Sequence, residues 1–124
     1  MRVSSRLAVL LLVPFAALIY LSSISFAETR TVEGIVQKVA DGDTVTLVTR
    51  DDAKLRVRLY GIDAPEVRHD GTPGQPFGEE AKRALAAKVL RKDVTLTIQD
   101  RDQYKRVVGI VMIGNRNINE EMMR

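Results

Sequence analysis

Alternation of apolar and polar residues predicts a small β-rich domain in the C-terminal three quarters of the chain. Five segments alternate in this way: 32–39, 44–49, 55–60, 94–98 and 107–113. A period of two is typical of strands that bury one face. Asp41-Gly42 joins the first two segments, and this dipeptide between β-rich runs is a strong hairpin signal. Residues 28–31 are expected to be a disordered lead-in.

A helix is predicted between the third and fourth strands. It begins near residues 76–79 and ends near Arg91, with acidic residues in its first turn and basic residues in its last. Its apolar stripe is expected to consist of Ala81, Ala84, Leu85 and Val89. A second, curtailed helix starts at Asn117 or Asn119, with Met122 and Met123 in the core. Five strands with a helix between the third and fourth predict an α+β, mainly β, OB-fold-like barrel.

The first 27 residues have the pattern of a secretory signal peptide. Arg2 and Arg6 precede the apolar run Leu7–Leu21, and Ser25-Phe26-Ala27 offers small residues for cleavage. We therefore expect a secreted or periplasmic protein without stable membrane association after cleavage. The alternative is an uncleaved N-terminal anchor, because the apolar run is nearly long enough to span a bilayer.

Composition limits the classes of partner and site. Removing residues 1–27 from the 124-residue chain leaves 97 residues, enough for one small domain (28–124). The formal charge of +3 falls to +1 without Arg2 and Arg6, so a basic total does not argue for nucleic acid. The chain has no cysteine, which excludes disulfides and thiolate-bound metals.

Four charged residues carry most of the candidate chemistry. Asp43 opens the second strand and Asp63 follows the third, so their carboxylates can adjoin as ligands of a hard cation such as Ca²⁺. Arg58 faces the same rim and can bind a phosphate through two hydrogen bonds. Each residue alone has a plainer interpretation as a surface or strand-end charge. Together with Glu66 they favour metal-assisted attack on a phosphodiester.

These residues lie in motifs that resemble a known family. Asp41-Gly42-Asp43-Thr44-Val45, followed by Arg58-Leu59-Tyr60-Gly61-Ile62-Asp63-Ala64-Pro65-Glu66, is similar to the thermonuclease (staphylococcal nuclease-like) family. The resemblance implies a Ca²⁺-dependent nuclease that cleaves DNA or RNA and leaves 3′-phosphate ends. It implies the Ala64 carbonyl as a third metal ligand, Glu66 as general base or orienter of the attacking water, and Arg58 and Arg106 as transition-state clamps.

The turn before Arg106 departs from the family pattern. Lys105 stands where the family has glycine, and lysine would adopt a positive φ only with strain, which would displace Arg106. Lys105 could instead bind phosphate itself. Tyr104 could stack on a base or sugar, or be an ordinary hairpin residue. Asp41 is expected to serve the turn, with a place in the outer shell of the metal as the alternative.

The sequence is also compatible with two other interpretations of function. The chain could be a non-catalytic OB-fold module that binds single-stranded nucleic acid, although three aromatic residues in 28–124 are few for stacking. It could also be an inactive remnant, because residues 117–124 resemble only the beginning of the family's second helix and the domain would be destabilised. We expect a monomer.

Overall fold

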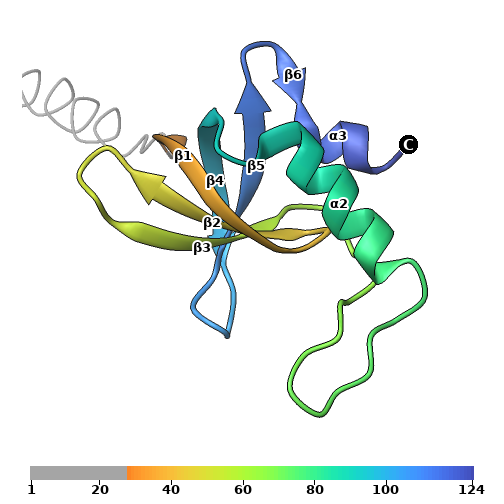
Figure 1. The fold of residues 1–124 in the computed structure, drawn as a ribbon. Coiled ribbons are helices and arrows are strands. Elements are labelled where there is room, and N and C mark those ends of the chain that lie inside the picture. Colours follow the sequence, from red (N-terminus) through yellow and green to blue (C-terminus); the bar gives the residue numbers. More distant parts are fainter. Residues whose placement is uncertain (1–27) are drawn as a thin grey trace, which may run out of the picture.

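A five-stranded mixed β-barrel forms the body of the domain (Figure 1). The computed structural model describes residues 28–124, so the predicted signal peptide lies outside the described residues. The barrel strands are β1 (Arg30–Asp41), β2 (Thr44–Thr49), β3 (Lys54–Leu59), β4 (Asp93–Arg101) and β5 (Val107–Ile113). Helix α2 (Gly78–Val89) lies between β3 and β4 in the chain, as predicted. The two-residue strand β6 (Arg116–Asn117) and helix α3 (Ile118–Met122) follow β5.

Parallel pairing of β3 with β5 closes the barrel. The other strands pair antiparallel in the order β3-β2-β1-β4-β5, and the closing register places Val57 beside Val107 and Leu59 beside Gly109. On its other side Gly109 packs closely against β4, where a Cβ would lie 2.5 Å from the carbonyl oxygen of Thr97. Closure therefore brings the ends of β3 and β5, which are distant in sequence, to one rim of the barrel.

Branched aliphatic side chains from every barrel strand fill the interior. The alternating pattern predicted this face, and its residues are almost wholly excluded from solvent because removing apolar surface from water is favourable. The core members from the strands are Val36, Val39, Val45, Leu47, Val57, Leu59, Val94, Leu96, Val107 and Val111.

Helix α2 covers one opening of this core with a stripe that differs slightly from prediction. Leu85 and Val89 are buried as expected, and Ala86 packs partly against the core. Ala84 is exposed, so its predicted place in the stripe is wrong. The helix ends where Leu90 takes an extended conformation.

Helix α3 is short but anchored by a buried asparagine. Asn119 accepts a hydrogen bond from the Val111 N–H at 3.0 Å and donates to the carbonyls of Tyr60 at 2.9 Å and Gly109 at 3.0 Å. These three bonds join α3 to the rim between β3 and β5. Met122 is partly buried, whereas Met123 is 64% exposed and its predicted core position is wrong.

Two strand boundaries extend beyond the apolar pattern. Arg30 and Thr31 belong to β1 because they pair with Ile98 and Thr97 of β4, which corrects the expected disordered lead-in. Backbone pairing continues past the last buried side chain, so the alternation of side chains does not show where the strand begins. Among residues 28–124, neither helix has the length and apolar character needed to cross a membrane.

Candidate active site

A hollow of about 540 Å³ lies at the rim where β2 begins and β3 ends. In Figure 1 the long loop between β3 and α2 and the hairpin between β4 and β5 project from this same end of the barrel. The hollow draws its walls from three separate chain segments: the β1–β2 turn, the end of β3 with its following loop, and the β4–β5 hairpin. Its lining residues are Asp41, Asp43, Arg58, Asp63, Glu66, Asp102, Gln103, Tyr104 and Arg106.

Asp43 is held rigidly in the β1–β2 turn. Its Oδ1 accepts the Thr44 hydroxyl at 2.8 Å, and its Oδ2 accepts the Ala64 N–H at 3.2 Å. Gly42 beside it does not have a positive φ. A Cβ at Gly42 would lie 2.6 Å from the Cβ of Ala81 on α2, so close packing of the turn on the helix is the physical reason for glycine here. The turn is therefore fixed by tertiary contact as well as by its own conformation.

Arg58 brings the two aspartates together. Its Nη2 lies 3.7 Å from Oδ2 of Asp43 and 3.7 Å from Oδ1 of Asp63, and it donates a hydrogen bond to the Ile62 carbonyl at 3.1 Å. The Asp43 side chain is only 10% exposed, whereas that of Asp63 is 97% exposed. One carboxylate is thus fixed and the other is open to solvent, and both converge on one cation.

The backbone of Glu66 is clamped from two sides. Its N–H donates to the side-chain carbonyl of Gln75 at 2.8 Å, and its own carbonyl accepts the Gln75 N–H at 2.8 Å. Asp41 holds the next residue, because its Oδ1 accepts the Val67 N–H at 3.0 Å. Asp41 therefore anchors the loop as well as lining the hollow, and the exposed Glu66 carboxylate projects from a fixed main chain.

Asp102 organises the β4–β5 hairpin around Arg106. Its Oδ1 accepts the N–H groups of Tyr104 at 2.9 Å and Arg106 at 3.0 Å, and its Oδ2 accepts Nε of Arg106 at 2.7 Å. Partial desolvation opposes ionisation of Asp102, but the hydrogen bonds from Arg106 and Tyr104 outweigh it and lower the pKa of this carboxyl. The Arg106 guanidinium also lies 5.4 Å from the centre of the Tyr104 ring.

The hairpin accommodates Lys105 in the conformation that the sequence indicated. Lys105 has φ 63, in the left-handed region where glycine is favoured. Arg106 nevertheless lines the hollow, since its pairing with Asp102 holds it there. The expected displacement of Arg106 is therefore absent.

The hollow collects most of the predicted site residues. Asp43, Arg58, Asp63, Glu66, Tyr104 and Arg106 all line it. Ala64 adjoins it through the bond from its N–H to Asp43. Lys105 is exposed at the hairpin tip and is not among the lining residues.

Three polar residues at this rim were not singled out by sequence reasoning: Gln75, Asp102 and Gln103. The role of Asp102 could have been predicted from the sequence, because an aspartate two to four residues before the N–H groups of a turn commonly accepts their hydrogen bonds. The role of Gln75 could not have been predicted in this way, because its partner Glu66 is nine residues away across a loop.

The donor chemistry of the hollow suits a hard divalent cation. Five carboxylates face two guanidinium groups there. Oxygen ligands of this kind are those that Ca²⁺ and Mg²⁺ prefer. Within residues 28–124 no three histidine, cysteine or acidic side chains are close enough to form a complete metal site by themselves. The two aspartates would therefore need backbone carbonyls or waters to complete a coordination shell.

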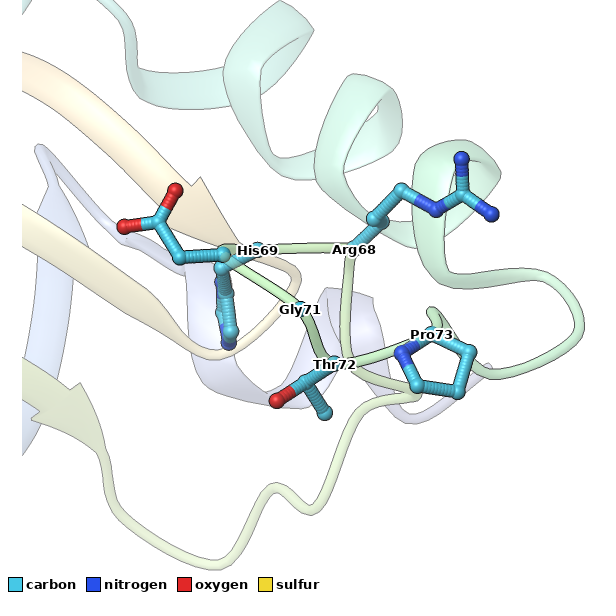
Figure 2. A pocket seen from close by; sticks show the side chains of 6 residues that line it. Arg68, His69, Gly71, Thr72 and Pro73 are labelled. Carbon is cyan, nitrogen blue, oxygen red and sulfur yellow. The ribbon is translucent and has the colours of Figure 1, made fainter.

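A second hollow of about 570 Å³ lies in the loop between β3 and α2. Figure 2 shows the Arg68 side chain pointing away from those of His69 and Thr72, so the polar groups do not converge. His69 is exposed. The hollow follows from the loop's own curvature, closed by the bridge between His69 and Thr72.

The barrel and its rim define an OB-fold-like protein with an acidic, arginine-containing site. Residues 56–124 match the family described as Staphylococcal nuclease homologue, and the chain belongs to this family. The resemblance stated from the motifs is confirmed.

Three relatives illustrate the similarity. The chain is 38% identical over 89 residues to a Haemophilus influenzae protein named as an uncharacterized endonuclease, covering 72% of this chain and 47% of that protein. It is 35% identical over 117 residues to endonuclease Htp3 of Saprolegnia parasitica, covering 80% of this chain and 56% of Htp3. It is 37% identical over 116 residues to protein ParB of Escherichia coli, covering 86% and 60%. The chain thus spans about half the length of the curated relatives it matches.

Proposed function

We propose that the protein is an exported, calcium-dependent nuclease that hydrolyses phosphodiester bonds of DNA, RNA or both. The observation that carries this proposal is the position of Arg58 Nη2, 3.7 Å from both Asp43 and Asp63, in a hollow that also contains Glu66 and Arg106. Two of the three relatives described above are named endonucleases, which supports the same reaction class.

Asp43, Asp63 and the backbone carbonyl of Ala64 are the proposed calcium ligands. Asp43 is oriented by Thr44 and by the Ala64 N–H, so it needs no rearrangement to present an oxygen. When bound, the cation would polarise a phosphoryl oxygen and offset the repulsion between the phosphate and the incoming water.

Glu66 is the proposed general base or orienter of that water. Its carboxylate is exposed in the hollow while its main chain is fixed by Gln75. A positioned base contributes about 10²–10⁴-fold to a rate. The proton would pass from water to the Glu66 carboxylate as the new P–O bond forms. The bond from phosphorus to the 5′ oxygen would break, so that the 5′ oxygen leaves with a proton from solvent and the phosphate stays on the 3′ side.

Arg58 and Arg106 are the proposed stabilisers of the phosphorane-like transition state. They line the hollow from two chain segments, β3 and the β4–β5 hairpin. Fixed guanidinium groups stabilise charge that develops on equatorial oxygens without costly reorganisation. Tyr104 and Lys105 would contact flanking parts of the substrate, and a monomer would suffice for the reaction.

Metal-dependent cleavage by the full chain tests the proposal. We expect degradation of labelled DNA or RNA with Ca²⁺, none with chelator, and a loss of about 10²-fold or more in Glu66→Gln. Glu79→Gln, which removes an exposed carboxylate from the first turn of α2, is the matched control and should remain active. Binding without cleavage would support the single-strand-binding module instead, and neither binding nor cleavage would support an inactive remnant.

Export is tested separately. We expect the protein recovered outside the cytoplasm to begin at residue 28, as read by N-terminal sequencing or intact mass. A recovered chain that retains residues 1–27 and sediments with membranes would support the uncleaved anchor.

A further inference from the structure

The hollow is too acidic to attract a polyanion by itself. Its five carboxylates outnumber its two guanidinium groups, so its formal charge is −3, and a bound dication would leave it at −1. A nucleic-acid strand carries one negative charge per nucleotide, and long-range attraction dominates its binding. The positive potential needed to seat a strand must therefore come from residues outside the hollow.

The outer surface of β1–β3 supplies positive charge directly beside the hollow. Cross-strand pairing forms one row from Asp41, Thr44 and Arg58, which belongs to the site. The next row on the same face, two residues further along β2 and β3, consists of Lys38, Thr46 and Arg56. Two residues of strand span about 6.7 Å. The cationic row, which contains Arg56, therefore lies about that distance from the row that contains Arg58.

The cations next to the site are free to bind a ligand. Lys38, Lys54 and Arg56 are exposed, and none has an acidic partner within ion-pair distance among residues 28–124. Arg50, on the turn that ends the same hairpin, instead pairs with Glu33 at 3.0 Å and with Asp93 at 3.6 Å. Cations on this surface can therefore form ion pairs, and these three do not.

Barrel closure extends the positive surface toward the part of the hollow lined by Arg106. The parallel register pairs Val57 with Val107, so position 56 of β3 adjoins position 106 of the hairpin. Arg56, at the β3 end of the cationic row, therefore lies on the side of that row nearest Arg106. In OB-fold barrels the face of the second and third strands is a common surface for oligonucleotides.

We propose that Lys38, Arg56 and Lys54 form a cationic track that binds the phosphates of a single nucleic-acid strand next to the scissile bond. The proposal rests on the nuclease function above and extends it with a substrate class, because a track outside the hollow benefits an oligonucleotide more than a dinucleotide. The distance between the rows is similar to the distance between successive phosphates of an extended strand. The track has no aromatic residue, so its contacts are to the backbone and carry no base preference.

Cleavage kinetics on substrates of two lengths test the track. The variant Lys38→Gln/Arg56→Gln is compared with Arg91→Gln/Lys92→Gln, which removes the same charge after the C-terminal end of α2. Because α2 begins beside Glu66 and runs for twelve residues, its other end lies about 18 Å further along the helix axis. We expect a KM for a single-stranded 12-mer raised roughly fivefold at low salt in the first variant, with kcat and the KM of a dinucleotide unchanged. The salt slope should fall by about 0.7 for each cation removed.

The outcomes separate this inference from the function on which it rests. Equal losses in the two double variants, an unchanged 12-mer KM, or equal effects on both substrates would overturn the track. If the unmodified chain cleaves neither substrate, the nuclease proposal fails. Equilibrium binding of the 12-mer in Ca²⁺ then tests the track directly, with weaker binding expected only for Lys38→Gln/Arg56→Gln and equal binding overturning it.

Discussion

Arg58 is the residue on which the candidate site converges. One of its nitrogens bridges Asp43 and Asp63, so two carboxylates that would otherwise repel each other share a cation in the described structure. Its side chain is 31% exposed, which leaves part of the guanidinium accessible from the hollow. The same group can therefore balance the aspartates and meet a phosphate.

Removing Arg58 should impair catalysis without weakening calcium binding. We expect kcat for Arg58→Ala to fall by about 10²–10³-fold, because a fixed donor to the transition state is lost. Calcium affinity, measured by titration calorimetry, should be equal or higher since a competing cation has left the two aspartates. Arg58→Lys is the matched control and should recover only part of the rate, because lysine cannot form a two-point contact. A wild-type kcat in Arg58→Ala would contradict the assigned role.

Lys105 shows how one strained residue is tolerated beside the site. Its positive φ is a conformation that costs a non-glycine residue of order 1–3 kcal/mol. The surrounding hydrogen bonds to Asp102 compensate, and they keep Arg106 in place.

Glycine at position 105 should stabilise the domain. We expect Lys105→Gly to raise the free energy of unfolding by about 1 kcal/mol, because relief of strain exceeds the added entropy of the unfolded chain. Lys105→Ala removes the same charge but keeps the strain, so it should not gain stability. Urea unfolding of both variants measures the difference. A destabilised Lys105→Gly would show that the lysine side chain contributes more than its backbone costs.

At the level of elements, the start of α2 is in contact with the loop that carries Glu66. Phe77 precedes the helix with φ 64 and offers no side-chain cap, so local capping does not explain where the helix begins. Gly78 lies against the carbonyl of Glu66, and a Cβ there would be 2.3 Å from that oxygen. The first turn of the helix therefore fixes the main chain of the proposed base.

Alanine at position 78 should disturb both stability and rate. Helix propensity alone predicts a gain for Gly78→Ala. We expect the opposite, a loss of about 1–3 kcal/mol from overpacking together with a lower kcat, because Glu66 must move. Gly71→Ala is the control: φ is +72 there but no atom lies within 4 Å, so it should show strain without a change in kcat. Equal kcat in Gly78→Ala and wild type would argue against the coupling.

At the scale of the whole molecule, Glu121 links three elements at the C-terminal end. It pairs with Arg116 of β6 at 2.8 Å and with Lys88 of α2 at 3.1 Å. Hydrogen bonds from Arg116 and Lys88 lower the pKa of the Glu121 carboxyl from its usual 4.5 to about 2. A carboxyl with a lowered folded-state pKa stabilises the fold when ionised.

The Glu121 contribution should disappear in acid. It is fully present above the unfolded pKa near 4.5 and is lost as the pH falls from there toward about 2. Glu121→Gln should therefore be less stable than wild type at pH 7, and the gap should close across that window. Urea midpoints between pH 7 and 2 measure it. Glu120→Gln, which changes an exposed neighbour, should show no such pH-dependent gap.

Much of the fold could be predicted because its information is local. Alternating residues marked the barrel strands, and charge placement marked α2. The predictions that failed concerned contacts made across space: Ala84 and Met123 face solvent because the barrel meets their helices from another side. Extension of β1 to Arg30 likewise depends on its partner β4.

The sequence by itself determined the identities of the candidate acids and arginines, the succession of strands and helix along the chain, and the family, because side-chain chemistry and periodicity are properties of the chain alone. Only the tertiary structure decided that Asp43 and Asp63 share one guanidinium, that Gln75 clamps Glu66 and that Asp102 holds Arg106. Barrel closure between β3 and β5 brings these segments to one rim, and closure depends on packing and register that no local pattern encodes.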